Sequence, residues 1–372
     1  MKVLVGDLFQ SKAQTLINTV NCVGVMGKGI ALEFKKRFPD MFEDYARRCA
    51  RGQVKPGIPY LYRSVLPPQI VNFPTKDHWK SVSRIEDVRN GLKYLADHFR
   101  EWEITSLAMP PLGCGNGQLE WRVVGPMIYR YATLMDIPVE LYAPYGTPPR
   151  ELTRDFLSQV PRCANGYAKE SARGGLNAAW IALVEIIRRL ENQPYCWPVG
   201  RTIFQKIAFV ATREGLPTGL QYEKGSFGPF SGGLKAVQTR LVNDSLLQEE
   251  RLGRMFRVTV GPNYERLRKG FEGALSQWTA IIERTTDLFT RMDTSRAEIA
   301  ATILFAADAL ARERTEPPLE GEVLASVMEW KQKRRPPLSE NEVATAIRNL
   351  AMLHWLNVRF DPQLPAQELE VV

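Results

Sequence analysis

Two glycine-rich segments have the composition of a phosphate-binding loop. The first contains Gly24-Val-Met-Gly27-Lys28-Gly29, and the second contains Gly113-Cys114-Gly115-Asn116-Gly117. Each follows a predicted strand and precedes a predicted helix, where free backbone amides and the helix dipole favour an anion. The first is not a familiar nucleotide loop, because Gly27-Lys28 lacks the following Ser or Thr of a Walker A motif and the order of its glycines is not that of a Rossmann loop. Two such loops could clamp a diphosphate from both sides.

A lysine at the end of another predicted strand is a candidate nucleophile. The segment Val71-Asn72-Phe73-Pro74-Thr75-Lys76-Asp77-His78-Trp79-Lys80 delivers Thr75 and Lys76 into a polar loop. A lysine amine becomes nucleophilic where apolar or cationic neighbours depress its pKa, and Phe73, Trp79 and Lys80 are such neighbours in the sequence. The alternative interpretation is a solvated basic loop, which is the commoner role of a lysine in such a loop.

Two further polar residues stand beside predicted strand ends. Asp7 follows the first strand and could accept a hydrogen bond from an adenine amino group, with the backbone after it donating to the ring. Asn21 precedes the first glycine-rich loop and could bind a ribose hydroxyl. The alternative interpretations are a turn or N-cap residue for Asp7 and a turn-former for Asn21.

An alternation of strands and helices must position these residues. The apolar residues of 85–99 recur on one helical face, and Ser83 with Glu86 predicts a capping box at its start. Another helix is expected over 30–38. This alternation indicates an α/β sheet whose ligand lies at the carboxyl ends of the strands. The predicted strands are 2–5, 15–20, 60–65, 70–73, 106–109 and 139–142.

The second half of the chain is predicted to be mostly helical, beyond a proline- and glycine-rich boundary at 144–175. A strand at 252–260 after helix, turn and helix indicates a possible winged helix-turn-helix. We therefore predict a domain at 1–155, a linker at 156–175, a helical domain at 176–361 and a loose tail at 362–372. The expected helices are 177–190, 202–213, 233–243, 264–288, 295–312, 321–331 and 339–353.

Charge and cysteine content narrow the function classes. The net charge is +8, and residues 1–150 hold 20 Lys and Arg against 14 Asp and Glu, which suits a polyanionic substrate. The remaining residues hold 29 against 27, which argues against a strong DNA binder in the second half. The five scattered cysteines form no zinc or disulfide framework and fit a reducing cytoplasm. With no apolar run of about 20 residues and no signal-peptide core, we expect a cytoplasmic protein without metal or cofactor.

Four segments, in this order, resemble a macrodomain of the DarG antitoxin family, which is related to the terminal ADP-ribose glycohydrolases. They are Gly-Asp-Leu at 6–8, Asn-Thr-Val-Asn-Cys-Val-Gly-Val-Met-Gly-Lys-Gly at 18–29, Asn-Phe-Pro-Thr-Lys-Asp-His-Trp at 72–79 and Gly-Cys-Gly at 113–115. The resemblance covers about residues 1–150, and more weakly 200–234. It implies an α/β fold, a three-layer α/β/α macrodomain with a mixed sheet, followed by the mainly α-helical domain.

The resemblance also implies a function. It implies an antitoxin that removes ADP-ribose from thymidine bases in single-stranded DNA, with Lys76 as the catalytic residue, and that binds a DarT-like toxin through its C-terminal domain. In the glycohydrolase relatives the lysine attacks C1 of the distal ribose and forms a covalent intermediate. An aspartate of their second loop corresponds to Gly117 here, so no acid–base partner is assigned. The implied ADP-ribose-binding residues are Asp7, Leu8, Thr19, Val20, Asn21, Met26, Gly27, Lys28, Gly29, Ile30, Ala31, Thr75, Gly113, Cys114, Gly115, Asn116 and Gly117.

Two other functions stay open from the sequence. A domain without the aspartate could bind ADP-ribose without hydrolysing it. A winged helix could instead make the protein a DNA-binding regulator with a ligand-sensing macrodomain.

Overall fold

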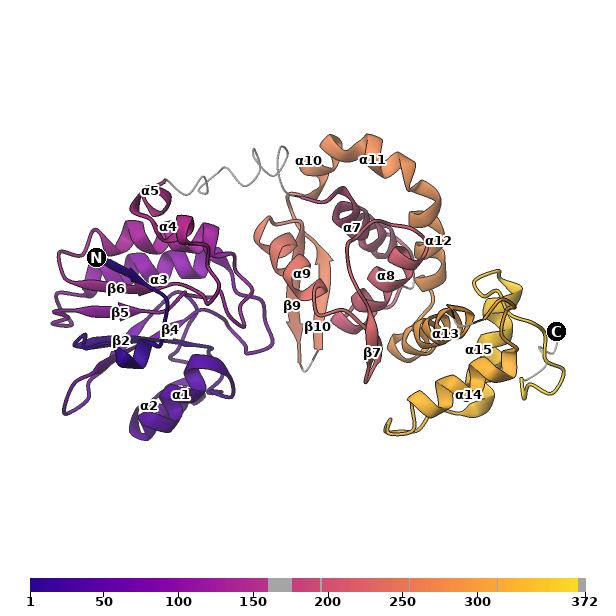
Figure 1. Cartoon of the computed structure of the whole chain (residues 1–372), viewed down its shortest axis with the longest axis horizontal. Coiled ribbons are helices and arrows are strands. Elements are labelled where there is room, and N and C mark those ends of the chain that lie inside the picture. Colours follow the sequence, from indigo (N-terminus) through magenta and orange to yellow (C-terminus); the bar gives the residue numbers. More distant parts are fainter. Residues whose placement is uncertain (160–175, 195, 254, 313, 367–372) are drawn as a thin grey trace. The chain divides into compact units, whose positions relative to one another are not determined.

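The computed structural model describes residues 1–159, 176–194, 196–253, 255–312 and 314–366. Contacts divide the chain into two units (Figure 1). The first contains Met1–Gly175 with Lys235–Asp244, and the second contains Leu176–Leu234 with Ser245–Val372. Most of the predicted linker and half of the predicted tail lie outside the described residues, so the domain boundaries stay predictions.

A six-stranded mixed sheet organises the first unit, as predicted. The strand order is β1-β6-β5-β2-β4-β3, and β3 alone is antiparallel to its neighbour. All six predicted strands are therefore confirmed, although several are shorter than expected. They are β1 (Lys2–Leu4), β2 (Thr15–Val20), β3 (Tyr60–Tyr62), β4 (Gln69–Pro74), β5 (Leu107–Met109) and β6 (Val139–Tyr142).

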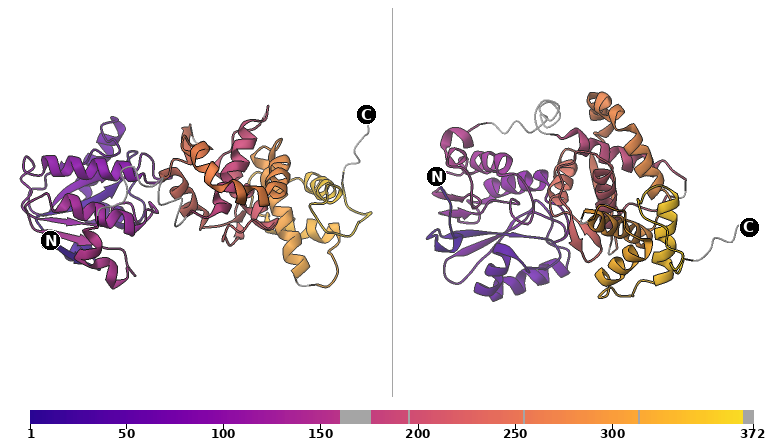
Figure 2. Two further views of the ribbon diagram at one scale, coloured as in Figure 1. Left: turned by 90° about the horizontal axis from the view of Figure 1, so that it is seen from above. Right: turned by 45° about the vertical axis from the view of Figure 1, so that its right-hand side comes forward.

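Helices cover both faces of this sheet because its central strands bury side chains on both sides. Successive strand residues point to opposite faces, so Leu16 packs in one core and Ile17 in the other. Helices α1 (Gly29–Arg37) and α2 (Pro39–Ala50) complete the first of these cores, and α3 (Ile85–His98) and α4 (Trp121–Ala132) complete the second. Figure 2 shows the resulting layers from two further sides.

The predicted capping box of α3 is wrong. Arg84 occupies the N-cap position and makes no side-chain capping hydrogen bond. Ser83 lies one residue earlier and is buried, so its hydroxyl faces the interior and cannot cap the helix. The sequence pattern placed the helix start correctly to within two residues but assigned the wrong role to the serine.

The second unit is mainly helical but contains more strands than predicted. Strand β10 (Met255–Val260) confirms the predicted strand, and it pairs antiparallel with β9 (Leu247–Leu252). A second hairpin joins β7 (Glu223–Gly225) and β8 (Gly228–Phe230). The expected helix at 264–288 is broken into α10 (Tyr264–Arg268), η3 (Lys269–Phe271), α11 (Glu272–Gln277) and α12 (Thr279–Phe289).

The other expected helices of the second half are present. They are α7 (Ala178–Glu191), α8 (Arg201–Arg213), α9 (Leu234–Asn243), α13 (Thr294–Arg312), α14 (Glu320–Trp330) and α15 (Glu340–Met352). The order of helices and hairpin is compatible with a winged helix, which stays a prediction. In the part of the chain that the structure describes, no helix combines the length and apolar character needed to cross a membrane.

Buried charges tie the elements of the second unit together. The Glu185 carboxylate of α7 accepts hydrogen bonds from Tyr264 Oη at 2.6 Å and Arg188 Nε at 2.9 Å. Lys331 directly follows α14, and its Nζ lies 2.7 Å from Glu298 Oε1 of α13. Lys206 Nζ of α8 donates to the Pro229 carbonyl at 2.7 Å. Each of these groups is satisfied by a specific partner, as buried polar groups must be.

Candidate active site

Three predicted site segments meet at one edge of the sheet. Strands β5, β2 and β4 are adjacent and parallel, so their carboxyl ends lie together. The first glycine-rich loop follows β2, Thr75 and Lys76 follow β4, and the second glycine-rich loop follows β5. The two loops approach each other closely, because a Cβ on Gly29 would lie 3.2 Å from Asn116 Nδ2. The expectation that both loops serve one site is compatible with this geometry.

The Lys76 side chain reaches the second of these loops. It is only 7% exposed, although lysine is among the residues least often buried. Its Nζ donates a hydrogen bond to the Asn116 carbonyl oxygen at 2.7 Å. The predicted nucleophile therefore contacts the second glycine-rich loop directly.

The backbone around Lys76 is fixed by the neighbouring strand. The Thr75 amide donates to the Val20 carbonyl at 3.0 Å, and the Cys22 amide donates to the Asp77 carbonyl at 2.9 Å. The Cys22 thiol also donates to the Lys76 carbonyl at 3.2 Å. Pairing thus continues beyond the ends of β2 and β4, which holds the lysine in register with the first loop.

Asn21 shapes the first glycine-rich loop from within. Its Oδ1 accepts from the Val23 amide at 3.0 Å, and its Nδ2 donates to the Val25 carbonyl. The Tyr45 hydroxyl of α2 donates to the Asn21 carbonyl at 2.9 Å. This is the turn-forming role that the sequence left open, and the contact with a ribose hydroxyl stays a prediction.

Asp7 occupies the N-cap of a short 3-10 helix, η1 (Leu8–Gln10). Its carboxylate accepts from the Phe9 amide at 3.0 Å, and Leu8 is buried. The contact with adenine stays a prediction. The remaining predicted binding residues lie where the sequence placed them, at the end of β2 (Thr19, Val20), in the first loop (Met26, Gly27, Lys28) and in the first turn of α1 (Gly29, Ile30, Ala31).

The second loop leaves no space for a side chain at Gly117. A Cβ there would lie 2.2 Å from the Gly113 carbonyl oxygen and 2.4 Å from Ser83 Oγ. At Gly115 of the same loop, a Cβ would have no neighbour within 4 Å. Gly117 stands where the resemblance to the terminal ADP-ribose glycohydrolases implies an aspartate, and this loop conformation leaves no room for that side chain.

Two cysteines and one carboxyl group near the lysine have perturbed pKa values. Burial raises the pKa of Cys22, with help from Asp77, and burial alone raises that of Cys114, in both cases to about 12. Both thiols are thus protonated near neutral pH and are poor nucleophiles. Burial also raises the pKa of Asp87, in the first turn of α3. Sequence reasoning missed Asp87, because only the fold shows that this helical carboxyl group is partly enclosed.

A pair of buried asparagines was also missed. Asn18 Nδ2 on β2 donates to Asn72 Oδ1 on β4 at 2.9 Å, and both residues are fully buried. The pair joins the strand before the first loop to the strand that carries Lys76. Asparagine within an apolar strand was the signal that could have revealed it, because a buried amide requires a partner. Among the described residues, no group of His, Cys, Asp and Glu could hold a metal ion.

Residues 17–128 match the family model of the Macro domain. This part of the chain is a Macro domain. The chain is 37% identical over 240 residues to a DNA ADP-ribosyl glycohydrolase of Thermus aquaticus, covering 63% of this chain and 62% of that protein. It is 40% identical over 172 residues to a DNA ADP-ribosyl transferase-DNA ADP-ribosyl glycohydrolase fusion protein of Thermosipho africanus. This match covers 41% of this chain and 44% of that protein.

A solved structure also matches the Macro domain. The macrodomain of Mycobacterium tuberculosis DarG is 43% identical, with a TM-score of 0.37, and the match covers 38% of this chain and 97% of that one. The chain spans less than two thirds of the length of the full-length glycohydrolase from Thermus aquaticus.

Proposed function

We propose that the Macro domain removes ADP-ribose from thymidine bases in single-stranded DNA, with Lys76 as the nucleophile. The observation that carries this proposal is the buried Lys76 amine, held 2.7 Å from the Asn116 carbonyl where the two glycine-rich loops meet. A diphosphate bound by the loop amides would leave the distal ribose at the lysine. The names of the relatives from Thermus and Thermosipho give the substrate class.

The proposed chemistry uses the lysine and water alone. The neutral Lys76 amine attacks C1 of the distal ribose, and the bond from C1 to the thymine nitrogen breaks. The thymine leaves with the bonding electron pair and takes up a proton, while the ribose ring opens to a Schiff base on Nζ. Water then adds to C1 and releases ADP-ribose and the free amine. A neutral amine that donates one N–H to Asn116 keeps its lone pair for this attack.

The test is release of ADP-ribose from a thymidine-ADP-ribosylated single-stranded oligonucleotide. We expect Lys76→Ala and Lys76→Arg to lose activity by about 100-fold or more, the low end expected when a catalytic group is removed. The arginine variant keeps a long basic side chain but cannot form a Schiff base. Lys80→Ala is the matched control, because Lys80 is an exposed lysine of the same loop. Calorimetry should show that every variant still binds ADP-ribose.

One observation favours a second function, an ADP-ribose reader. Gly117 leaves the domain without the aspartate of the glycohydrolase relatives. Binding of ADP-ribose by the wild-type protein without any release would support the reader and reject the hydrolase. Full activity of Lys76→Ala would instead retain the hydrolase and reject the nucleophile.

We further propose that the second unit binds a DarT-like ADP-ribosyltransferase toxin. The Thermosipho relative is by its name a fusion of a DNA ADP-ribosyl transferase and a DNA ADP-ribosyl glycohydrolase, so a transferase and a glycohydrolase are joined in one protein there. The near-neutral charge of residues 151–372 favours a protein partner over DNA. Leu252 and Met255 are paired at the end of the β9–β10 hairpin and are 45% and 58% exposed. Adjacent exposed apolar side chains are typical of a protein interface.

This second proposal is tested by calorimetric titration of the full chain with the toxin. We expect Leu252→Glu and Met255→Glu to weaken binding by about ten-fold or more, as loss of an apolar contact at an interface does. Met352→Glu is the matched control, since Met352 is similarly exposed on α15. Equal binding by all three variants would reject the hairpin as the contact. Strong, salt-dependent affinity of the full chain for duplex DNA would favour the regulator instead.

A further inference from the structure

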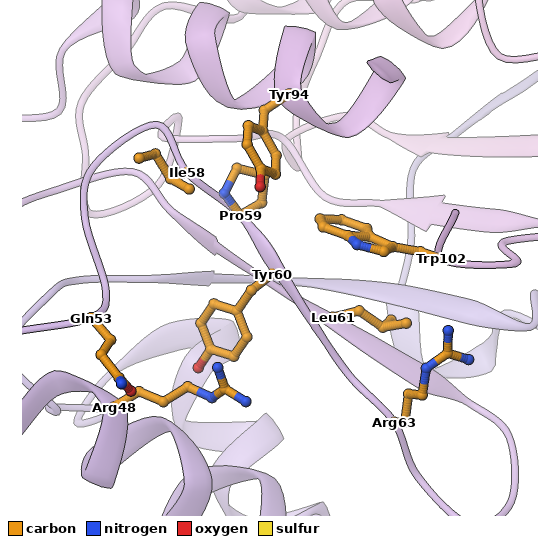
Figure 3. A pocket seen from close by; sticks show the side chains of 9 residues that line it. All are labelled: Arg48, Gln53, Ile58, Pro59, Tyr60, Leu61, Arg63, Tyr94 and Trp102. Atoms are coloured by element: carbon orange, nitrogen blue, oxygen red, sulfur yellow. The ribbon is translucent and has the colours of Figure 1, made fainter. Parts of the chain in front are cut away.

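A pocket lies at the open edge of the sheet, outside the glycine-rich loops. It has a volume of about 330 Å³, at the lower end of the range for small-molecule sites. Figure 3 shows edge strand β3 between the side chains of helix α2 and those of helix α3. The pocket is lined by Arg48, Gln53, Ile58, Pro59, Tyr60, Leu61, Arg63, Tyr94 and Trp102.

Aromatic rings form one wall of this edge pocket. Tyr94 and His98 are stacked on α3 with ring centroids 3.9 Å apart, and Trp102 lies 6.0 Å from Tyr94. All three side chains are only partly buried. Partly exposed aromatic rings beside a pocket are stacking platforms for nucleic-acid bases, because every base offers a π-face.

Arginines supply the opposite wall and the rim. The Arg48 guanidinium lies 4.7 Å above the Tyr60 ring, and Figure 3 shows Arg63 beside Leu61 farther along the strand. Arg63 pairs with Glu103 at 2.9 Å, but both side chains are largely exposed, so the pair is weak and a phosphate can replace the carboxylate. Residues 45–63 contain five Lys and Arg and no Asp or Glu. Of these, Arg48 and Arg63 line the pocket, and Arg48 pairs with Asp44 at 2.7 Å as Arg63 does with Glu103, so a phosphate would compete with one partly exposed carboxylate at each arginine.

The strand order puts this pocket beside the strand that leads to the proposed reacting group, and the pocket extends from there away from Lys76, because Tyr62 pairs with Ile70. Lys76 follows β4, and β3 is the next and last strand of the sheet. Tyr60 pairs with Asn72, which precedes Lys76 by four residues and hence by about 13 Å along the strand. That distance corresponds to about four nucleotides at the rise of a duplex strand, and to fewer in an extended single strand.

We infer that the edge pocket binds a nucleotide of the single-stranded DNA that carries the ADP-ribose, a few nucleotides from the modified thymine. The base stacks on Tyr94 and Trp102, and the phosphate pairs with Arg63 or Arg48. This inference rests on the proposed function for its substrate. The adenosine diphosphate part would lie over β1, β5 and β2, and the DNA would leave across β4 and β3.

Binding of unmodified DNA tests the pocket without any turnover. The probe is a fluorescent oligothymidylate of about 20 nucleotides, titrated with the full chain and followed by anisotropy. We expect Tyr94→Ala to weaken binding by about ten-fold, within the range for loss of one stacked base. Arg63→Ala should lower the slope of log affinity against log salt by about 0.7, the share of one phosphate contact on a single strand.

Arg130→Ala is the matched control, because Arg130 is an exposed arginine on α4, away from the pocket. Melting curves and ADP-ribose binding verify that each variant is folded. Wild-type DNA affinity and salt slope in both pocket variants would overturn the inference. Loss of toxin binding with unchanged DNA binding would also overturn it, in favour of a protein partner.

A photo-crosslink gives an independent readout that survives a folding defect in either variant. An oligonucleotide with 5-iodouracil should crosslink the wild-type chain at Tyr94 or Trp102, as mapped by mass spectrometry. Crosslinks confined to other residues would overturn the inference.

If DNA binds the pocket but no ADP-ribose is released from modified DNA, the pocket stands and the proposed hydrolase fails. If both activities are present, the pocket variants should lower kcat/KM on a long modified strand but not on a modified mononucleoside.

Discussion

Restoring the aspartate of the glycohydrolase relatives should damage the second loop and should not improve catalysis. The change is Gly117→Asp, with Gly117→Ala to separate bulk from charge. Even the alanine Cβ would lie 2.2 Å from the Gly113 carbonyl oxygen and 2.4 Å from Ser83 Oγ. Backbone cannot give way as a flexible side chain does, so the loop must move. Overpacking of this kind costs about 1–3 kcal/mol.

Melting temperature and turnover measure this cost. For a unit of this size, 1 kcal/mol corresponds to roughly 2–4 °C, so both variants should melt roughly 2–12 °C lower. The melting transition that belongs to the first unit is the one whose temperature rises when ADP-ribose is added, because the ligand binds the folded form of that unit. Loop movement would also separate Asn116 from Lys76 Nζ, so ADP-ribose release should fall in both variants.

Gly115→Ala is the matched control for stability, because a Cβ at Gly115 meets no atom within 4 Å. It should melt within about 2 °C of wild type, as open-surface substitutions usually do. Faster release by Gly117→Asp, or unchanged melting of both Gly117 variants, would refute the reasoning about this loop.

Three further predictions concern titratable groups. Burial opposes ionisation of Glu185, but hydrogen bonds from Arg188 and other groups lower its pKa to about 2. The stability that the ionised Glu185 adds to the folded state should be complete above its ordinary pKa and lost as the pH falls towards 2. The melting temperatures of wild type and Glu185→Gln should therefore converge in acid. Burial, with the neighbouring Lys331, lowers the pKa of Lys206 to about 7. Because the unfolded chain then binds one more proton at this lysine, wild type should gain up to about 1.4 kcal/mol of stability per pH unit between about pH 7 and 10, and Lys206→Met should gain less. Burial raises the pKa of Asp87, so if it protonates the leaving thymine, Asp87→Asn should slow release and remove the alkaline limb of the pH–rate profile, whereas Asp97→Asn, near the other end of α3, should leave both unchanged.

Much of the site could be predicted because it depends on local pattern and on parallel topology. Glycine-rich loops after apolar strands predict anion binding wherever the strands lie, and parallel neighbours bring the carboxyl ends of their strands together. That logic was sufficient to predict that the two glycine-rich loops could clamp one diphosphate, whereas the resemblance to a macrodomain added Lys76 to that site. The contact between Lys76 Nζ and the Asn116 carbonyl gives this prediction a specific geometry.

Other features depend on partners far away in the sequence. The loop-shaping role of Asn21 involves Tyr45 on α2, and the steric restriction at Gly117 involves Ser83, before α3. The edge pocket combines residues from α2, β3 and α3, none of which carries a motif. In the second unit, β9 has the sequence Leu-Gln-Glu-Glu-Arg-Leu and is mostly exposed, so no apolar alternation marked it as a strand.

The most direct test of the central claim is to trap the proposed intermediate on Lys76. Wild-type protein is mixed with ADP-ribosylated single-stranded DNA and borohydride, which reduces a Schiff base to a stable amine, and the adduct is located by mass spectrometry of peptides. The account predicts an ADP-ribosyl adduct on Lys76 that is absent from Lys76→Ala and present in Lys80→Ala. Rapid release of ADP-ribose with no adduct on Lys76, or with an adduct on another residue, would contradict it.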